Sequence, residues 1–343
     1  MTDAFEIIGQ DRALATLDRA VASGRVAHAY LFHGPRGVGK HAVALRFASR
    51  LLCEHPDGAD PCGRCPSCVA FRAGEHPDFD RIAPPPGARN LSIDAVRELT
   101  RRASLSSSRG VRRVFVIDDA HALTEEAANS LLKILEEPPP GTVIVLVTHR
   151  PESLLPTVVS RTRAIPFHPL RREACLDVLD KRHGVPREEA EPLASLALFS
   201  PGRALELRES VSYKRKEEIL ERLCDVKRET VFEAASDLLE IARETGGGKT
   251  LENLREGLRQ VFLLAGAFLR DVEARRRAGD GAEMIFRAPA GALRRALARG
   301  GGRWAAPGLD ALGRARDALD GNVTPSLVTE WWLSDLVRKM DER

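Results

Sequence analysis

The sequence has 343 residues, a length at which two or three domains are expected. Its 43% hydrophobic content is enough for buried cores, and 52 lysines and arginines against 49 aspartates and glutamates give a net charge of +3, which neither requires nor excludes a nucleic-acid partner. No apolar run reaches the length of a membrane span and the polar start, MTDAFEIIGQ, lacks a signal-peptide pattern, so we expect a cytoplasmic protein with no membrane partner.

An amphipathic helix is predicted over residues 10–23, followed by a short apolar strand at residues 29–32 and a glycine-rich loop. Gly34, four further residues and then Gly39-Lys40 have the spacing of a phosphate loop. In such a loop Gly34, Gly37 and Gly39 allow backbone N–H groups to curl inward, and Lys40 reaches the outer phosphates. The sequence therefore predicts a strand–loop–helix unit suited to a nucleotide.

One position departs from this motif. A phosphate loop carries Ser or Thr after its lysine, where the hydroxyl binds Mg²⁺, but this chain has His41. Two interpretations stay open: a loop that still binds ATP through Lys40, or a loop that keeps its shape and has lost its chemistry. Under either interpretation, the absence of the hydroxyl argues against hydrolysis of ATP with Mg²⁺.

Four of the six cysteines are close together in the sequence, at Cys53, Cys62, Cys65 and Cys68. Four thiolates can complete a tetrahedral zinc site, and the short C-x-x-C spacings hold one ion in a tight turn. Four protein ligands leave no position for water, which favours a structural Zn²⁺ over a catalytic one. The alternative is a set of free thiols without metal.

A second strand is predicted at residues 79–82, and Ser92 opens a helix before an apolar strand that ends in Asp118 and Asp119. In phosphate-loop proteins such a strand lies beside the loop strand, its Asp binds the metal, and the next carboxylate polarises the attacking water. Asp118 fits the metal role, whereas Asp119 is one methylene shorter than the usual Glu and would misplace the base. The alternative is that both acids only favour the start of the following helix, at residues 125–137.

An apolar strand at residues 142–148 suits a sheet that is buried on both faces. A short helix or turn carrying Arg161 and a fifth strand at residues 164–167 complete a parallel α/β pattern. Beyond this strand, long amphipathic helices predict a packed bundle. We therefore expect three domains: an α/β domain at 1–167 with a cysteine module at 53–74, a small helical domain at 168–211, and a helical domain at 212–343.

These pieces, in this order, resemble the clamp-loader branch of the AAA+ proteins and, more closely, the delta-prime family of bacterial DNA polymerase III subunits. The resemblance extends from residue 1 to about residue 210 and is weaker beyond it. Its marks are the cysteine insertion after the phosphate-loop helix, Gly74-x-His76-Pro77-Asp78, Leu91-x-Ile93-Asp94-x-Val96-Arg97, Asn129-x-Leu131-Leu132-Lys133-x-Leu135-Glu136-Glu137-Pro138-Pro139, and Ser160-Arg161.

The resemblance implies an AAA+ domain, a helical lid and a C-terminal helical collar that joins subunits. It implies that Thr148 is the sensor-1 residue and Arg203 the sensor-2 residue of the nucleotide site. It also implies that Arg161 serves the ATP site of an adjacent subunit. The implied partners are gamma/tau motor subunits, the delta subunit, the sliding clamp and primer–template DNA, in the nucleoid-associated replisome.

Two functions from different classes follow. The first is a stator subunit of the clamp loader, with no polymerase activity and little or no ATPase activity of its own. The second is the ATP-hydrolysing motor subunit, which carries the same cysteine insertion. His41, Asp119 and His76-Pro77-Asp78 favour the stator. An unrelated phosphate-loop ATPase, such as a helicase loader, is disfavoured by the cysteine insertion and the helical second half.

Overall fold

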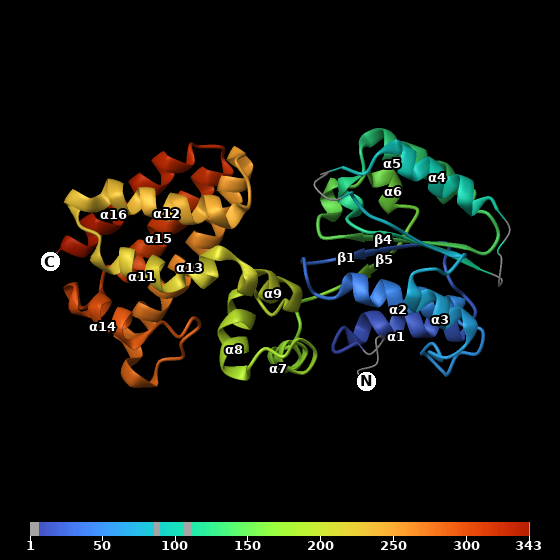
Figure 1. Ribbon diagram of the computed structural model, residues 1–343, viewed down its shortest axis with the longest axis horizontal. Coiled ribbons are helices and arrows are strands. Elements are labelled where there is room, and N and C mark those ends of the chain that lie inside the picture. Colours follow the sequence, from blue (N-terminus) through green and yellow to red (C-terminus); the bar gives the residue numbers. More distant parts are fainter. Residues whose placement is uncertain (1–6, 86–89, 106, 108–111, 343) are drawn as a thin grey trace. The chain divides into compact units, whose positions relative to one another are not determined.

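The computed structural model describes residues 7–85, 90–105, 107 and 112–342 (Figure 1). The predicted lack of a signal segment falls largely on residues 1–6, which lie outside this range. The chain forms two compact units. The first comprises Met1–Val178 and Ser200–Gly202, and the second comprises Leu179–Phe199 and Arg203–Arg343. The division into three domains therefore stays a prediction.

The first unit contains a five-stranded parallel sheet with the strand order β2-β3-β4-β1-β5. The predicted fold class, a five-stranded parallel α/β domain followed by helices, is confirmed. Each predicted strand is present within one or two residues of its expected bounds: β1 at Ala29–His33, β2 at Phe79–Ile82, β3 at Arg113–Ile117, β4 at Thr142–Thr148 and β5 at Arg163–Pro166.

The predicted neighbour of the loop strand is wrong. The strand that ends before Asp118, β3, does not pair with β1, because β4 lies between them and pairs with both. All seven residues of β4 are buried, as are all five of β3. Two strands that are equally apolar on both faces are equally suited to the middle of a sheet, so their composition could not decide which one adjoins β1.

Helices cover both faces of this sheet (Figure 1). One face packs against α1 (Asp11–Ala22) and α2 (Lys40–Leu52), the other against α4 (Ile93–Ala103) and α5 (Glu125–Glu136). Successive residues of β1 alternate between the two cores, so that Phe32 belongs to one and Leu31 to the other. Each fully buried side chain of this kind stabilises the fold by about 1.5–3 kcal/mol.

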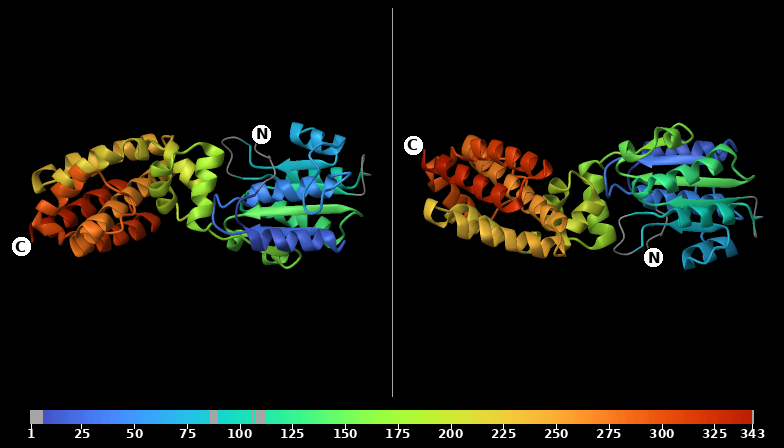
Figure 2. Two further views of the ribbon diagram at one scale, coloured as in Figure 1. Left: turned by 90° about the horizontal axis from the view of Figure 1, so that it is seen from below. Right: turned by 90° about the horizontal axis from the view of Figure 1, so that it is seen from above.

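The second unit is built from helices, which Figure 2 shows as a bundle running to the C-terminus. Its core includes Trp332, which is fully buried and packs edge-on against Phe262. Trp331, the next residue, is 45% exposed. The main helices are α8 at Arg187–Leu196, α9 at Pro201–Glu209, α10 at Val211–Lys214, α11 at Lys216–Asp225, α12 at Val231–Gly246, α13 at Leu251–Ala278, α14 at Ala290–Ala298, α15 at Ala305–Asp320 and α16 at Pro325–Asp341.

Two of the helices are interrupted. α7 (Arg172–Asp177) continues as a short π-helical turn, Val178–Arg182. Arg215 separates α10 from α11. Among the helices that the structure describes, none is long and apolar enough to cross a membrane.

Candidate nucleotide-binding site and four-cysteine centre

The predicted strand–loop–helix unit is present between β1 and α2. Gly39 immediately precedes α2 and has a φ of 98°, a left-handed conformation that favours glycine. Gly34 has a φ of 138°, and a Cβ atom there would lie 2.2 Å from the carbonyl oxygen of Phe167. The loop therefore requires glycine at both positions, at Gly39 for its backbone angle and at Gly34 also for close contact with the end of β5.

Lys40 is turned back onto this loop. Its Nζ atom donates hydrogen bonds to the carbonyl oxygens of Gly34, at 2.8 Å, and Pro35, at 2.6 Å, and only 6% of the residue is exposed. Burial lowers the pKa of Lys40 to about 8, although the nearby charges of Asp119 and Asp118 act in the opposite direction. The ammonium group is thus held at the loop, where phosphate oxygens can replace the two carbonyls.

Asp118 contacts two side chains of the protein itself. Its Oδ2 atom lies 3.1 Å from His41 Nδ1, although not in hydrogen-bond alignment, and 3.1 Å from Arg81 Nη2. Burial by itself would raise the pKa of Asp118, but His41 and Arg81 lower it below the ordinary value. The carboxylate expected to bind Mg²⁺ is therefore ionised and already partnered, with His41 in the position of the missing hydroxyl.

Asp119 lies just after the end of β3, and Thr148 is the last residue of β4. Both lie at the same edge of the sheet. Thr148 is buried, and its hydroxyl oxygen lies 3.3 Å from His121 Nδ1 and accepts a hydrogen bond from the Arg150 amide. Asp119 Oδ1 lies 3.7 Å from His149 Nδ1. Sequence reasoning missed both histidines, although each follows the end of an adjacent strand by a few residues.

A further contact to the loop was also missed. Gly202 donates its amide hydrogen to the carbonyl oxygen of Gly37 at 2.9 Å, and the Ser200 hydroxyl donates to the carbonyl oxygen of Arg36 at 2.5 Å. A Cβ atom at Gly202 would lie 2.8 Å from the Gly37 Cα atom. The start of α9 therefore braces the loop. The signal in the sequence is Ser200-Pro201-Gly202, which is typical of a helix start and does not by itself indicate a contact with the loop.

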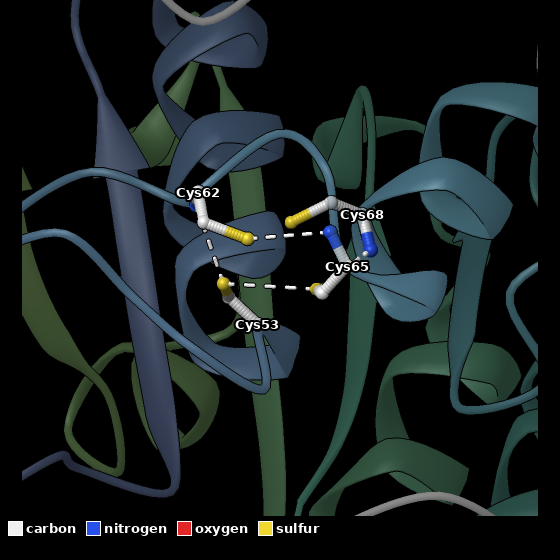
Figure 3. A group of neighbouring side chains, drawn as sticks. All are labelled: Cys53, Cys62, Cys65 and Cys68. Atoms are coloured by element: carbon white, nitrogen blue, oxygen red, sulfur yellow. Dashed lines mark hydrogen bonds between the residues drawn. The ribbon is translucent and has the colours of Figure 1, made fainter.

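The four predicted cysteines come together at the end of α2 and the start of α3 (Pro66–Ala73), with their sulfurs directed toward a common centre (Figure 3). Their four sulfur atoms lie within 4.8 Å of one another, and the Cys53 and Cys65 sulfurs are 4.0 Å apart. Ligands of one tetrahedral zinc are separated by roughly 3.8 Å, given Zn–S bonds of about 2.3 Å. The residues fit a tetrahedral metal ion with little movement.

Backbone amides support these sulfurs as metal ligands. The amide of Cys62 donates to the Cys53 sulfur, and that of Cys65 donates to the Cys62 sulfur. Amide hydrogen bonds from Arg64 and Cys65 lower the pKa of Cys62 to about 6, whereas burial raises the pKa values of Cys53 and Cys68. A bound cation would deprotonate the remaining thiols, because coordination favours the thiolate. The cluster can hold a metal ion.

Protein contacts also hold the cysteine module in place. The buried Arg46 of α2 pairs with Asp60, at 2.8 Å, and with Asp18, at 3.3 Å. Phe71 of α3 packs against Phe79 of β2 with ring centroids 4.4 Å apart. These contacts fix the module to both α2 and the sheet.

The comparisons with known proteins concern the N-terminal half of the chain. Residues 9–171 match the family model described as DNA polymerase III, delta subunit. The DNA polymerase III subunit delta-prime of Pseudomonas aeruginosa is 40% identical over 181 residues, which are 52% of this chain and 54% of that protein. Over this region the chain is similar to the DNA polymerase III delta-prime subunits. The predicted resemblance is confirmed over this region.

Gamma/tau subunits of DNA polymerase III are also similar to this chain. The DNA polymerase III subunit gamma/tau of Mycobacterium bovis is 38% identical over 188 residues, 54% of this chain and 32% of that protein. The matched segment thus spans about half of the delta-prime sequence and a third of the gamma/tau sequence. A gamma subunit-related protein from Thermotoga maritima aligns over 96% of this chain and 99% of its own, with 19% identity and a TM-score of 0.40.

The two arginines implied by the delta-prime resemblance lie outside this loop. Arg161 follows α6 (Pro156–Val159); its Nη2 atom pairs with Glu136 of α5 at 2.7 Å and its Nη1 atom donates to the Thr157 carbonyl. Arg203 is exposed on α9, in the second unit. The roles of both arginines therefore stay predictions.

Proposed function

We propose that the chain is a stator-type, delta-prime subunit of a DNA polymerase III clamp loader and that it helps to load the sliding clamp onto primed DNA. In this proposal it works in the cytosol, at the nucleoid-associated replisome, without polymerase activity and with little or no ATPase activity. Residues 168–211 act as the lid and residues 212–343 as the collar. The partners are gamma/tau and delta subunits, the clamp and primer–template DNA.

The contacts of the Asp118 carboxylate are the observation that favours a stator over a motor subunit. A motor subunit must bind Mg²⁺ between this carboxylate and a loop hydroxyl. Here His41 replaces the hydroxyl, and both His41 and Arg81 lie 3.1 Å from Asp118. A magnesium ion would have to displace these two contacts and would gain no hydroxyl in return. Nucleotide binding through Lys40 and the loop amides remains compatible with this arrangement, whereas hydrolysis is disfavoured.

The test compares ATP turnover by the purified chain with that of a variant restored toward the motor pattern, His41→Thr with Asp119→Glu. We expect no turnover above background in the natural chain and either none or a small gain in the variant. Turnover on the order of 1 per second in the natural chain, abolished by Lys40→Ala, would establish the motor function instead. The 38% identity to a gamma/tau subunit is the observation that keeps this second candidate.

Assembly is tested separately. The chain is purified together with candidate gamma/tau and delta subunits and measured by native mass spectrometry. A stator should enter one complex with both, in one copy. Failure of the chain to join either subunit, when they assemble with each other, would refute the clamp-loader proposal whatever its ATPase activity.

We also propose that the four-cysteine centre holds a structural Zn²⁺. Four sulfur ligands favour zinc among the common divalent ions, and the closed ligand set leaves no position for a reacting water. Metal analysis of fresh, reduced protein should find about one zinc per chain. A different metal at the same stoichiometry would change the identity of the ion but not the site.

Arg161 is proposed to act at the ATP site of an adjacent motor subunit. Its guanidinium is always charged and can contact two phosphate oxygens, and its salt bridge with Glu136 lies at a partly exposed position from which it can be released. Arginines in this role contribute roughly 10³ to 10⁵ in rate at the site they serve. Arg161→Ala in a reconstituted loader should leave assembly intact, reduce ATPase partly and reduce clamp loading more. Unchanged ATPase and loading in an assembled variant complex would exclude the role.

A further inference from the structure

A second cluster of metal-ligating side chains lies at the carboxyl edge of the sheet. Asp119 directly follows β3, His121 lies in the short 3-10 turn Ala120–Ala122, and His149 directly follows β4. β3 and β4 are parallel neighbours, so the residues after their carboxyl ends meet at one edge. One ligand atom from each residue lies within 4.8 Å of the other two.

The distances within this cluster are close to those of a metal site. Asp119 Oδ1 lies 3.9 Å from His121 Nδ1 and 3.7 Å from His149 Nδ1. Two ligands of one tetrahedral zinc lie roughly 3.3 Å apart, given bonds of about 2.0–2.1 Å. The two imidazole rings already touch, with centroids 4.2 Å apart and an interplanar angle of 73°. A contraction of about half an ångström would bring the ligands to bonding distance.

The backbone directs the two consecutive acids to different partners. Asp119 has a φ of 48° and a ψ of 47°, a left-handed conformation that aspartate adopts more readily than most residues other than glycine. Its carbonyl oxygen accepts the Ala122 amide hydrogen at 2.7 Å, which holds the turn. As a result Asp118 contacts His41 and Arg81, while Asp119 contacts His121 and His149.

We propose that Asp119, His121 and His149 bind one divalent transition-metal ion, with Zn²⁺ as the expected occupant, at a site distinct from the four-cysteine centre. Two imidazoles and one carboxylate are the protein ligands of zinc sites that keep an open fourth position. Imidazole ligands select Zn²⁺ and similar ions over Mg²⁺, which prefers oxygen. The open position would hold water or an anion. When Asp119 binds the ion, it is not available as a base for hydrolysis.

The surrounding charges have two opposing effects on this site. Burial, followed by neighbouring charges, lowers the pKa of His149 to about 4 and also lowers that of His121, so both imidazoles are neutral at pH 7 and can bind metal without losing a proton. Lys40 and Arg150 lie near both histidines, and Arg36 near His121, so they repel a dication. We therefore expect weaker binding than at the four-cysteine centre and a preference for an anion in the open position.

Thr148 competes with the metal for one ligand. Its hydroxyl oxygen lies 3.3 Å from His121 Nδ1 and also accepts the Arg150 amide hydrogen, so the hydroxyl hydrogen can be donated to the imidazole. Coordination through Nδ1 requires that this hydroxyl turn away. Thr148→Val removes the competing donor and should leave metal affinity unchanged or raise it by up to about fivefold, the effect of one hydrogen bond of about 1 kcal/mol.

The experiment is a titration of the full chain with Zn²⁺, by equilibrium dialysis and metal analysis, repeated with Co²⁺ for its spectrum. We expect two equivalents. The first equivalent binds at the four-cysteine centre and the second at Asp119, His121 and His149. Asp119→Asn and His149→Ala should each weaken binding of the second equivalent by more than about 100-fold, because loss of even an outer partner of a metal ligand weakens binding 10- to 100-fold. Both variants should still bind the first equivalent. Cys65→Ser should lose the first equivalent and keep the second. Cobalt in the second site should lack the sulfur-to-metal charge-transfer absorption that the first site shows.

The control is His168→Ala, which removes an exposed histidine from the same unit and should retain both equivalents. Circular dichroism checks that each variant is folded, and Asp119→Asn preserves the size of the side chain if His149→Ala does not fold. A second equivalent that survives in both Asp119→Asn and His149→Ala would overturn the proposal, as would the absence of a second equivalent in the natural chain. A second equivalent with sulfur charge-transfer absorption would assign it to cysteine and would also overturn it.

Discussion

The two ends of α2 carry two sites that differ in how complete they are. Lys40 begins the helix at the phosphate loop, and Cys53 follows its last residue, roughly 20 Å away at 1.5 Å per residue. At the cysteine end all ligands come from one short stretch of chain and converge. At the loop end the side chains come from several strands, and Asp118, the carboxylate predicted to bind Mg²⁺, contacts His41 and Arg81. A local ligand set can be complete in the sequence, whereas a dispersed one depends on which partners the fold supplies.

The largest effect should follow loss of a cysteine. Cys65→Ser removes one of four predicted ligands, and the tightly bound zinc that copurifies at the cysteine centre should fall from about one per chain to near zero. Structural zinc sites contribute apparent binding energies of about 10–16 kcal/mol, so residues 53–74 should lose protection from amide hydrogen exchange. The sheet should keep its protection, because its cores do not include the cysteines.

Val69→Ser is the matched control for that variant, because Val69 lies on α3 and is 52% exposed. It should retain both zinc and protection. Loss of protection throughout the sheet in Cys65→Ser would show that the module is not an independent structural unit.

The next effect tests the rigidity of the loop end. Gly34→Ala places a Cβ atom 2.2 Å from the Phe167 carbonyl oxygen, in a backbone conformation that alanine rarely adopts. We expect the free energy of unfolding to fall by about 2–4 kcal/mol, as for other strained backbone positions. Gly58→Ala, also at positive φ but with open space around it, should cost only about 1–2 kcal/mol. Equal losses in denaturant titrations of both variants would exclude a steric role for Phe167.

These sites also show what the sequence could and could not predict. The clustering of the four cysteines, all five strands and the glycine loop followed from local spacing and hydrophobic patterns. The position of β4 between β3 and β1 did not, because both strands are apolar throughout and nothing local ranks them. Because β4 is the neighbour of β3, His149 at the end of β4 lies close to Asp119 at the end of β3. The hydrogen bond between Gly202 and Gly37 joins residues that are far apart in the chain, and no short sequence motif predicts it.

The two ends of α2 should respond to pH in opposite directions. Burial lowers the pKa of Lys40 to about 8, so anion binding at the loop should weaken about tenfold between pH 7 and pH 9 as the ammonium loses its proton. Metal binding by the cysteines should strengthen over the same range, because thiols must lose protons to bind. Isothermal titration with ATP and with Zn²⁺ measures both trends. Lys40→Met should weaken ATP binding and remove its pH dependence, and a persistent dependence would assign it to another group.

Lys40 also affects stability with a defined sign. Its folded-state pKa of about 8 lies below the ordinary 10.5, so the unfolded chain holds more protons between these values. The contribution of Lys40 to the free energy of unfolding should therefore rise with pH across this window, and Lys40→Met should lack this rise. A difference between the two proteins that is constant from pH 8 to pH 10.5 would contradict the lowered pKa.

The smallest effect concerns the ion pair between Arg81 and Asp118. Arg81 is half exposed, and Asp118 retains some exposure, so solvent screens the pair and Arg81→Gln should cost less than about 1 kcal/mol at pH 7. Because the folded-state pKa of Asp118 is lowered, the pair stabilises the fold above the carboxyl group's ordinary pKa, and this contribution is lost as the pH falls through the lowered value. The variant and the natural chain should therefore become equally stable in acid, and high salt should also reduce their difference. The control Arg97→Gln removes an exposed arginine that pairs with Asp94 within α4, and should change stability by a few tenths of a kcal/mol. A difference that persists undiminished in acid would mean that Arg81 acts through packing, and the loop end would then be held by more than charge.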